Sequence, residues 1–330
     1  MMDVAALAGV SQATVSLVLN GEPTVRLSQA TRQRVRKAAK DLGYEFVRRT
    51  SRSLMQGGAT IVFVADEVTT DPWMPMAFEG VRDKALESGV GAVLAVSHGQ
   101  EEAEAAIVGQ MAGLNVLGFV YGTALTRPIT LSSDLLQWPT VLVNCYERER
   151  TLLSILPGDT QGGRAATENL LAAGRTRIGF INGQDGVDAS RDRLKGYKQA
   201  LSTFDLPFDP ELVRPGNWEP SSGYEMTLEL MRLPHPPDAV FCANDMMALG
   251  CLDALAALGL KVPHDVSVIG FDDREVAQFT HPPLSTLVLP HYEMGEIAAQ
   301  ALIDAETGAS RRVTQIKVEC QLIERGSVRA

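Results

Sequence analysis

Four polar side chains stand where apolar, β-branched runs of the sequence end, and these positions suit the binding of a small molecule. They are Asn144, Asn182, Asn244 and Asp272. Runs of this kind form buried strands, and open parallel sheets bind their ligands beyond the carboxyl ends of the strands. We therefore expect these amides and this carboxylate to face a ligand cleft. The alternative for Asn244 and Asp272 is that each only caps the helix that follows it.

The sequence offers little for covalent catalysis or for holding a metal. It contains no G-x-x-x-x-G-K-[ST] phosphate loop, no G-x-S-x-G elbow and no H-E-x-x-H pair, and no strand-like run leads into G-x-G-x-x-G. Among the five histidines, His235, His264 and His281 stand beside prolines, where we expect surface loops. These patterns predict a protein that is not an enzyme and needs no cofactor or metal.

Strand-like and helix-like stretches alternate from residue 60 onward, and this alternation predicts the fold class. The expected strands are 60–66, 90–97, 116–122, 140–144, 177–183, 212–216, 239–245 and 266–273, and the expected helices are 74–88, 101–113, 161–173, 190–203, 221–232 and 246–258. Strands that alternate with helices form parallel sheets with helices on both faces. We therefore expect an α/β body over 59–330, built of two doubly wound parallel-sheet lobes with a cleft between them. The chain should cross between the lobes near 156–160 and 286–290.

The segment 1–44 carries the pattern of a helix-turn-helix headpiece. A short helix with Leu7 and Ala8 on its inner face ends at Gly9, where a helix end needs a positive φ. Ala5 is small enough for two helices to cross closely, and Val15 fills the space between them. The second helix would lie in the major groove of DNA with its first residues at the base edges. A third helix is expected to follow, with these residues turned inward: Val35, Ala38, Ala39 and Leu42.

Charge is divided unevenly along the chain. Residues 1–56 hold nine Lys and Arg but four Asp and Glu, whereas the rest holds 21 basic and 36 acidic residues, and the net charge is −10. Such asymmetry indicates a module that binds a polyanion, attached to a body that repels one.

The stretch DVAALAGVSQATVSLVLNG resembles the headpiece of the lactose-repressor (LacI/GalR) family of bacterial transcription regulators, and later blocks extend the resemblance along essentially the whole chain. The resemblance implies base contacts from Gln12, Ala13 and Leu17. Gln12 can pair bidentately with adenine and Ala13 can contact a thymine methyl, whereas Leu17 stands where Arg or His is common. The resemblance implies phosphate contacts from other polar residues of this helix: Ser11, Thr14, Ser16 and Asn20.

A linker over 45–58 joins the headpiece to the body. In the family such a linker forms a short helix on DNA and wedges a leucine into the minor groove, which bends the duplex. The resemblance implies that Leu54 is this wedge, with Arg52 beside it; the alternative is a flexible linker.

The family also has a few residues before the Asp-Val-Ala block, where only Met1 and Met2 stand here. We expect either an upstream start or a weakly capped first helix.

Blocks of the body resemble the family's effector domain, which is itself similar to periplasmic sugar-binding proteins. They are DPWMPMAFEGV, TVLVN, RDRLKGY, GNWEPSSGY, FCANDMMALG and VIGFDD. In the family these blocks line the small-molecule site, which implies effector contacts from Trp73, Met74, Asn144, Arg193, Trp218, Asn244 and Asp272. Such polar groups can hold the hydroxyls of a polyol while tryptophan rings stack on its C–H face. Leu289 stands where relatives often carry Gln, which removes one hydroxyl contact.

Residues and resemblance together predict a ligand-responsive, sequence-specific transcription regulator, expected to repress carbohydrate-metabolism genes. Its expected partners are near-palindromic double-stranded operator DNA, a small sugar bound between the lobes, and a second copy of the chain, because a two-fold dimer matches two half-sites. Tetramers of the family usually need an additional C-terminal helix, so we expect a homodimer. Three alternatives stay open: a regulator that responds to a purine or nucleoside, a cytosolic sugar-binding protein without a DNA role, and an α/β enzyme with a helical extension.

Composition sets the expected compartment. The chain is 45% hydrophobic and 21% charged, and no apolar run approaches the ~20 residues of a membrane span. The N-terminus lacks the basic and apolar regions of a signal peptide. Four cysteines stand far apart without a C-x-x-C pair, and each is expected to be a small buried residue: Cys145, Cys242, Cys251 and Cys320. We expect a cytoplasmic protein that makes no contact with membranes.

Overall fold

The computed structural model describes residues 58–69, 72–111, 113–306 and 314–329, together with isolated positions between 7 and 39. The chain forms two compact units, Met1–Gln56 and Gly57–Ala330.

Helical residues of the first unit supply a small core. Ala8, Val35, Ala38 and Ala39 are helical and buried, as their spacing predicts. Leu7 was expected on the same inner face as Ala8, but this expectation is wrong, since its side chain is 57% exposed. Consecutive helical residues point about 100° apart, so burial of Ala8 turns Leu7 outward.

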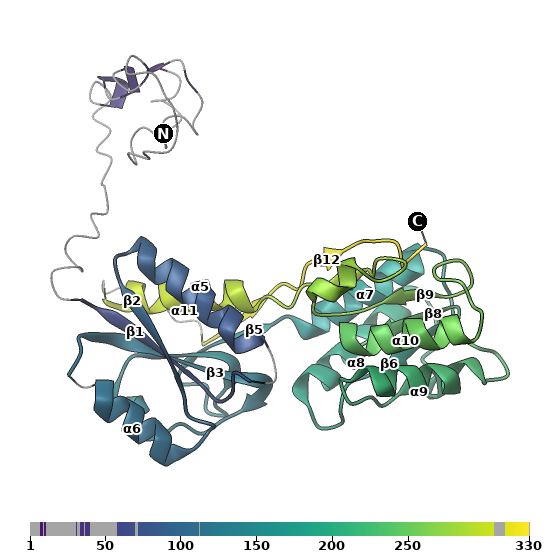
Figure 1. Ribbon diagram of the computed structural model, residues 1–330, viewed down its shortest axis with the longest axis horizontal. Coiled ribbons are helices and arrows are strands. Elements are labelled where there is room, and N and C mark those ends of the chain that lie inside the picture. Colours follow the sequence, from purple (N-terminus) through teal and green to yellow (C-terminus); the bar gives the residue numbers. More distant parts are fainter. Residues whose placement is uncertain are drawn as a thin grey trace. The chain divides into compact units, whose positions relative to one another are not determined.

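The first lobe of the second unit is built on a parallel sheet of six described strands, in the order β11-β5-β4-β3-β1-β2. These strands are β1 (Thr60–Ala65), β2 (Gly91–Val96), β3 (Val116–Pro128), β4 (Thr140–Tyr146), β5 (Leu153–Pro157) and β11 (Gln315–Val318). The helical elements of this lobe are α5 (Trp73–Glu87), α6 (Glu101–Met111), η1 (Leu135–Gln137) and α11 (His291–Glu306). Helices α5 and α11 pack together on one face and α6 covers the other (Figure 1).

Strand β1 shows why both faces of this sheet carry helices. Successive residues of a strand point to opposite faces. Val62 and Val64 join an apolar cluster with Val108 of α6. Phe63, on the other face, packs edge-on against Phe78 of α5 with ring centroids 6.1 Å apart. A run that is apolar at every position therefore needs a covering layer on each side.

The second lobe has a parallel sheet of four described strands, in the order β7-β6-β8-β9. These strands are β6 (Ile178–Ile181), β7 (Val213–Arg214), β8 (Ala239–Cys242) and β9 (Ser267–Ile269), and a separate antiparallel pair joins β10 (Thr286–Leu287) to β12 (Leu322–Ile323). The helical elements are α7 (Asp159–Ala172), α8 (Asp188–Thr203), η2 (Pro210–Leu212), α9 (Pro220–Met231), α10 (Asp245–Ala257) and η3 (Glu275–Gln278).

The core of the second lobe also has two covered faces. The Phe180 ring of β6 stacks on Phe241 of β8 at 4.6 Å and on Tyr197 of α8 at 5.3 Å between centroids. The neighbouring residue Gly179 faces Leu230 of α9. Helices α7 and α8 pack together, as do α9 and α10, so each pair covers one face. The two parallel-sheet lobes confirm the predicted fold class.

Within the described ranges the chain passes between the lobes three times. It runs from β5 into α7 through Gly158, from β10 into α11 through Leu289 and Pro290, and from β11 into β12. The last passage was not expected, because the sequence pattern assigns no element after residue 273.

Helices α5 and α11 cross at two glycines. A Cβ on Gly80 would lie 2.0 Å from the carbonyl oxygen of Tyr292, and a Cβ on Gly295 would lie 2.0 Å from that of Ala77. Only glycine permits this approach.

The four cysteines are buried and unbridged, as expected. No helix in the described part of the chain has the length and apolar character needed to cross a membrane.

Candidate functional site

A cavity of about 470 Å³ lies between the two lobes, at the carboxyl ends of their strands. Among its lining residues are six side chains that the sequence assigned to the effector: Trp73, Asn144, Arg193, Trp218, Asn244 and Asp272. Trp73 begins α5 and Asn144 lies in β4, so the first lobe supplies two of them. The other four come from the second lobe, so the cavity depends on both lobes.

Two other predicted residues do not line this cavity. Met74 is 1% exposed and packs with Phe63 against Gly122 of β3. One residue beyond Trp73, its side chain points about 100° further around α5 and therefore enters the core. Asn182 is 6% exposed and accepts a hydrogen bond from the backbone N–H of Gly183 at 2.9 Å.

Arg193 of α8 is held by groups at the base of the cavity. Its Nε donates to Oδ1 of Asp159 at 2.8 Å, and both side chains are at most 3% exposed. Its Nη1 donates to the carbonyl oxygen of Ala243, and its Cζ lies 3.6 Å from the ring centroid of Phe271. This buried ion pair joins the start of α7 to the ends of β8 and β9, so Arg193 organises the floor of the cavity.

The amide groups of Asn144 and Asn244 hydrogen-bond other parts of the protein. Nδ2 of Asn144 donates to the carbonyl oxygens of Thr123 at 2.8 Å and Ala124 at 3.1 Å, and its Oδ1 accepts from the Thr126 hydroxyl at 2.5 Å. This residue has a φ of 58°, which the bonds stabilise.

Asn244 caps α10. Its Oδ1 accepts from the N–H of Met247 at 2.8 Å, as an N-cap does, and its Nδ2 donates to the carbonyl oxygen of Trp218 at 2.9 Å. The cap that we kept as an alternative for Asn244 is therefore present. Its side chain also fixes the backbone of an aromatic cavity residue.

Trp218 is positioned by its backbone and by a glycine. Its φ is 70°, an uncommon value for a bulky residue. Its indole lies so close to Gly183 that an added Cβ there would be 2.0 Å from Cη2. The indole Nε1 is buried, and no group in the described ranges accepts its hydrogen.

An aromatic pair forms the wall contributed by the first lobe. The rings of Trp73 and His291 stack at 5.4 Å with 20° between their planes, and the guanidinium carbon of Arg274 lies 5.1 Å from the Trp73 ring centroid. His291 is 1% exposed. Burial lowers its pKa to about 3, and the positive charge of Arg193 acts in the same direction.

Asp272 connects the second lobe to a passage between the lobes. Its backbone N–H donates to the carbonyl oxygen of Leu287 at 2.7 Å, and its φ is 118°. Its carboxylate lies 3.9 Å from a guanidinium nitrogen of Arg193 and 3.9 Å from one of Arg274. The oxygens of this carboxylate can accept hydrogen bonds from a ligand as well as from the two guanidinium groups.

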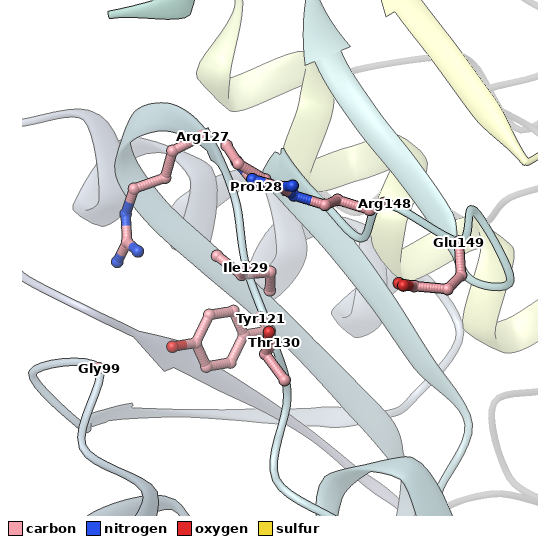
Figure 2. A pocket seen from close by; sticks show the side chains of 8 residues that line it. All are labelled: Gly99, Tyr121, Arg127, Pro128, Ile129, Thr130, Arg148 and Glu149. Carbon is pink, nitrogen blue, oxygen red and sulfur yellow. The ribbon is translucent and has the colours of Figure 1, made fainter. Parts of the chain in front are cut away.

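A second cavity, of about 370 Å³, lies within the first lobe. Figure 2 shows Tyr121 beside Ile129 and Thr130, with Arg148 and Glu149 on the loop after β4. Arg127 at its edge pairs with Asp66 at 3.0 Å. None of the sequence-predicted site residues lines this cavity, so the cavity between the lobes is the better candidate.

The residues expected to contact DNA lie outside the described part of the chain. They are Ser11, Gln12, Ala13, Thr14, Ser16, Leu17, Asn20, Arg52 and Leu54.

Comparison with known proteins decides the family. The family model for bacterial regulatory proteins of the lacI family matches residues 1–45, and the model for a periplasmic binding protein-like domain matches 167–328. The HTH-type transcriptional repressor CytR of Escherichia coli (strain K12) is 33% identical over 331 residues, which cover 100% of this chain and 96% of CytR. The chain belongs to the LacI family of bacterial regulatory proteins. It is therefore a transcription regulator.

Two solved structures of LacI-family proteins show the same architecture. A complex of the transcriptional regulator CelR with cellobiose has a TM-score of 0.68 and 34% identity, and the match covers 98% of both chains. The lac repressor dimer bound to operator and the anti-inducer ONPF has a TM-score of 0.69 and 26% identity, over 99% of this chain and 98% of that one.

Several cavity residues of this LacI-family regulator were not predicted from sequence. Asp159, Arg274 and His291 line the cavity beside the predicted residues. Asp159 and His291 are the first residues of α7 and α11, directly after Gly158 and Pro290. The signal that could have indicated these two residues is a helix start directly after a Gly or Pro, at a place where the chain passes from one lobe to the other.

The described residues contain no cluster of His, Cys, Asp or Glu suited to a metal ion.

Proposed function

We propose that this regulator binds near-palindromic operator DNA as a homodimer, and that a small sugar in the cavity between its lobes changes its affinity for that DNA. The observation that supports the sugar site most directly is the single cavity lined by Trp73 of one lobe and Trp218 of the other. Tryptophan rings pack on the C–H face of a sugar while nearby polar groups hold its hydroxyls. CelR, whose solved complex contains cellobiose, is similar over nearly the whole chain.

A ligand that contacts both lobes binds each lobe arrangement with a different affinity. That difference is the free energy available to change DNA affinity. The ribose operon repressor of Escherichia coli, 32% identical over 99% of both chains, and CytR are both named repressors. We propose repression for this chain as well, and action in the cytoplasm, where bacterial operators lie.

A nucleoside is the second candidate for the ligand. Trp73 and Trp218 both line the cavity, and an aromatic wall can also stack on a flat base. Thermal unfolding of the full chain with D-ribose, cellobiose and adenosine separates the candidates. A bound compound at 100 times its dissociation constant adds about 2.7 kcal/mol of stability. No stabilisation by any of the three would contradict both ligand assignments.

Operator binding is tested separately from ligand binding. Selection of sites from random duplexes should enrich a sequence with two related half-sites. On that site Gln12→Ala should relax specificity at one base position, and Leu54→Ala should weaken specific more than non-specific binding. Equal losses on the selected site and on random DNA would contradict both assignments. Failure to enrich any sequence would contradict the proposed DNA function.

A further inference from the structure

Two side chains of the cavity carry buried polar atoms without a partner. Neither Nδ1 nor Nε2 of His291 has a hydrogen-bond partner in the described ranges, and the same holds for Nε1 of Trp218. Both side chains line the cavity between the lobes. Buried polar groups are nearly always hydrogen-bonded, because leaving one unpaired is costly. These atoms therefore indicate what a bound molecule must supply.

His291 is the more informative of the two. With a pKa of about 3, its imidazole is neutral at physiological pH. A neutral imidazole has one nitrogen that donates a hydrogen bond and one that accepts one. A hydroxyl group both donates and accepts, so hydroxyl groups of a ligand complement this ring. Nε1 of Trp218 can only donate, and a further ligand oxygen would satisfy it.

The amides of Asn144 and Asn244 have less capacity to recognise a ligand. Both donor hydrogens of the Asn144 amide are used by backbone carbonyls. The oxygen of Asn244 caps α10, and its nitrogen holds Trp218. The sequence pattern assigned ligand contacts to Asn144 and Asn244 and none to His291. Because the two amides are used within the protein, we expect His291 to contribute more to ligand selectivity than they do.

Charge in the cavity disfavours an anionic ligand. Its ionisable lining residues besides His291 are Glu67, Asp159, Arg193, Glu219, Asp272 and Arg274, so carboxylates outnumber guanidinium groups. Arg193 is already paired with Asp159 at 2.8 Å. A phosphate on the ligand would meet net negative charge, whereas hydroxyl groups would not.

His291 lies where the chain passes from the second lobe into the first, so a ligand bound to it is held at that passage. It is the first residue of α11 and follows Pro290 directly, and its ring stacks on Trp73 at the start of α5. A ligand bonded to His291 is thereby tied to the first lobe at the point where the chain enters it.

We propose that His291 is the specificity-determining residue that binds a hydroxyl pair of an uncharged polyhydroxy ligand, donating one hydrogen bond and accepting another. The inference rests on the proposed function of the cavity and specifies its ligand: a free sugar or a nucleoside rather than a sugar phosphate.

Calorimetric titration of the full chain tests this role. The probes are D-ribose, cellobiose, adenosine and D-ribose 5-phosphate. His291→Phe keeps an aromatic ring beside Trp73 but removes both hydrogen bonds, whereas His291→Gln keeps a neutral donor and acceptor. His235→Phe, at an exposed histidine outside the cavity, is the matched control.

We expect at least one uncharged probe to bind the wild-type chain. His291→Phe should weaken it about tenfold or more, His291→Gln about threefold or less, and His235→Phe should leave it unchanged. D-ribose 5-phosphate should bind more weakly than D-ribose. If His291→Phe fails to fold, ¹⁵N-histidine spectra of the wild-type chain replace it, because the ring nitrogens of His291 must shift when the probe binds.

Three results would overturn the inference. Wild-type affinity in His291→Phe, or unchanged ring-nitrogen shifts, would remove the role of His291 and leave the cavity as a ligand site. Equal loss in the Phe and Gln variants would show that the residue only supports the fold. Binding of D-ribose 5-phosphate alone would refute the uncharged ligand. If none of the probes binds the wild-type chain, the proposed ligand site itself is contradicted. The selection of DNA sites tests the proposed DNA function separately.

Discussion

Gly183→Ala should displace Trp218 from the cavity while leaving the second lobe folded. The new Cβ would lie 2.0 Å from Cη2 and 2.1 Å from Cζ2 of the indole, and 2.6 Å from Oγ of the buried Ser190, whose hydroxyl must rotate away. Carbon atoms in contact are about 3.5–4.0 Å apart, so the ring edge must move by about 1.5–2 Å. Because the indole is only partly buried, this movement should cost about 1 kcal/mol of unfolding free energy, at the low end for overpacking.

The effect on binding should be larger than the effect on folding. Loss of an aromatic contact is worth about 1–2 kcal/mol, or roughly a 5–30-fold weaker affinity. Titration with the sugar that binds the wild-type chain measures it. Indole fluorescence gives a readout without ligand, because the buried Nε1 of Trp218 becomes exposed and its emission should shift to the red. A Trp218→Phe variant identifies the contribution of this indole among the three tryptophans.

A double-mutant cycle supplies the decisive comparison. If the alanine acts only through the indole, Gly183→Ala should add nothing to the loss caused by Trp218→Ala. Gly109→Ala is the matched control, since a Cβ at this helical glycine meets nothing within 4 Å. Additive losses from Gly183→Ala and Trp218→Ala, or unchanged emission together with unchanged affinity, would refute the reasoning.

Three further changes test the framework of the cavity. Asp159→Asn should leave the buried Arg193 guanidinium without its nearest carboxylate and lower the free energy of unfolding by about 3 kcal/mol, measured by urea denaturation; a change near zero would contradict the ion pair. Gly295→Ala should lower it by about 2 kcal/mol, because the new Cβ would overlap the carbonyl oxygen of Ala77, and an unchanged midpoint would contradict the close helix crossing. Burial raises the pKa of Asp245 from 3.8 to about 7, so its stabilising contribution is present below pH 4 and is lost as the pH rises through 7. Relative to Asp245→Asn, the wild-type chain should therefore lose about 2 kcal/mol between pH 5 and 8, and parallel pH profiles would refute this.

Elements whose formation depends on local pattern were predictable from the sequence. Helix α5 was expected over 74–88 and spans Trp73–Glu87, because apolar residues recur along it at helical spacing. Strand β11 was missed because its stability comes from distant pairing. Ile316 pairs with Ile155, and such a partner leaves no mark in the adjacent sequence.

The site shows a similar division. Polar residues at strand ends indicated the cavity, since parallel strands bring their carboxyl ends together. Whether such a residue caps a helix or contacts a ligand could not be predicted, because the same residue type at the same place does both. Asn244 is the example: its oxygen caps α10. His291 was missed because its burial depends on α5, which is remote in the sequence.

The internal hydrogen bonds of Asn144 and Asn244 constrain how effector specificity can evolve in this chain. Substituting either amide would release a loop or a helix cap along with any ligand contact, so selection for a new effector would be opposed by loss of folding stability. Trp73, Leu289 and His291 line the same cavity, and none of the three is the N-cap of a helix in the described part of the chain. New ligand preferences should therefore arise through these three positions, while the amides stay unchanged.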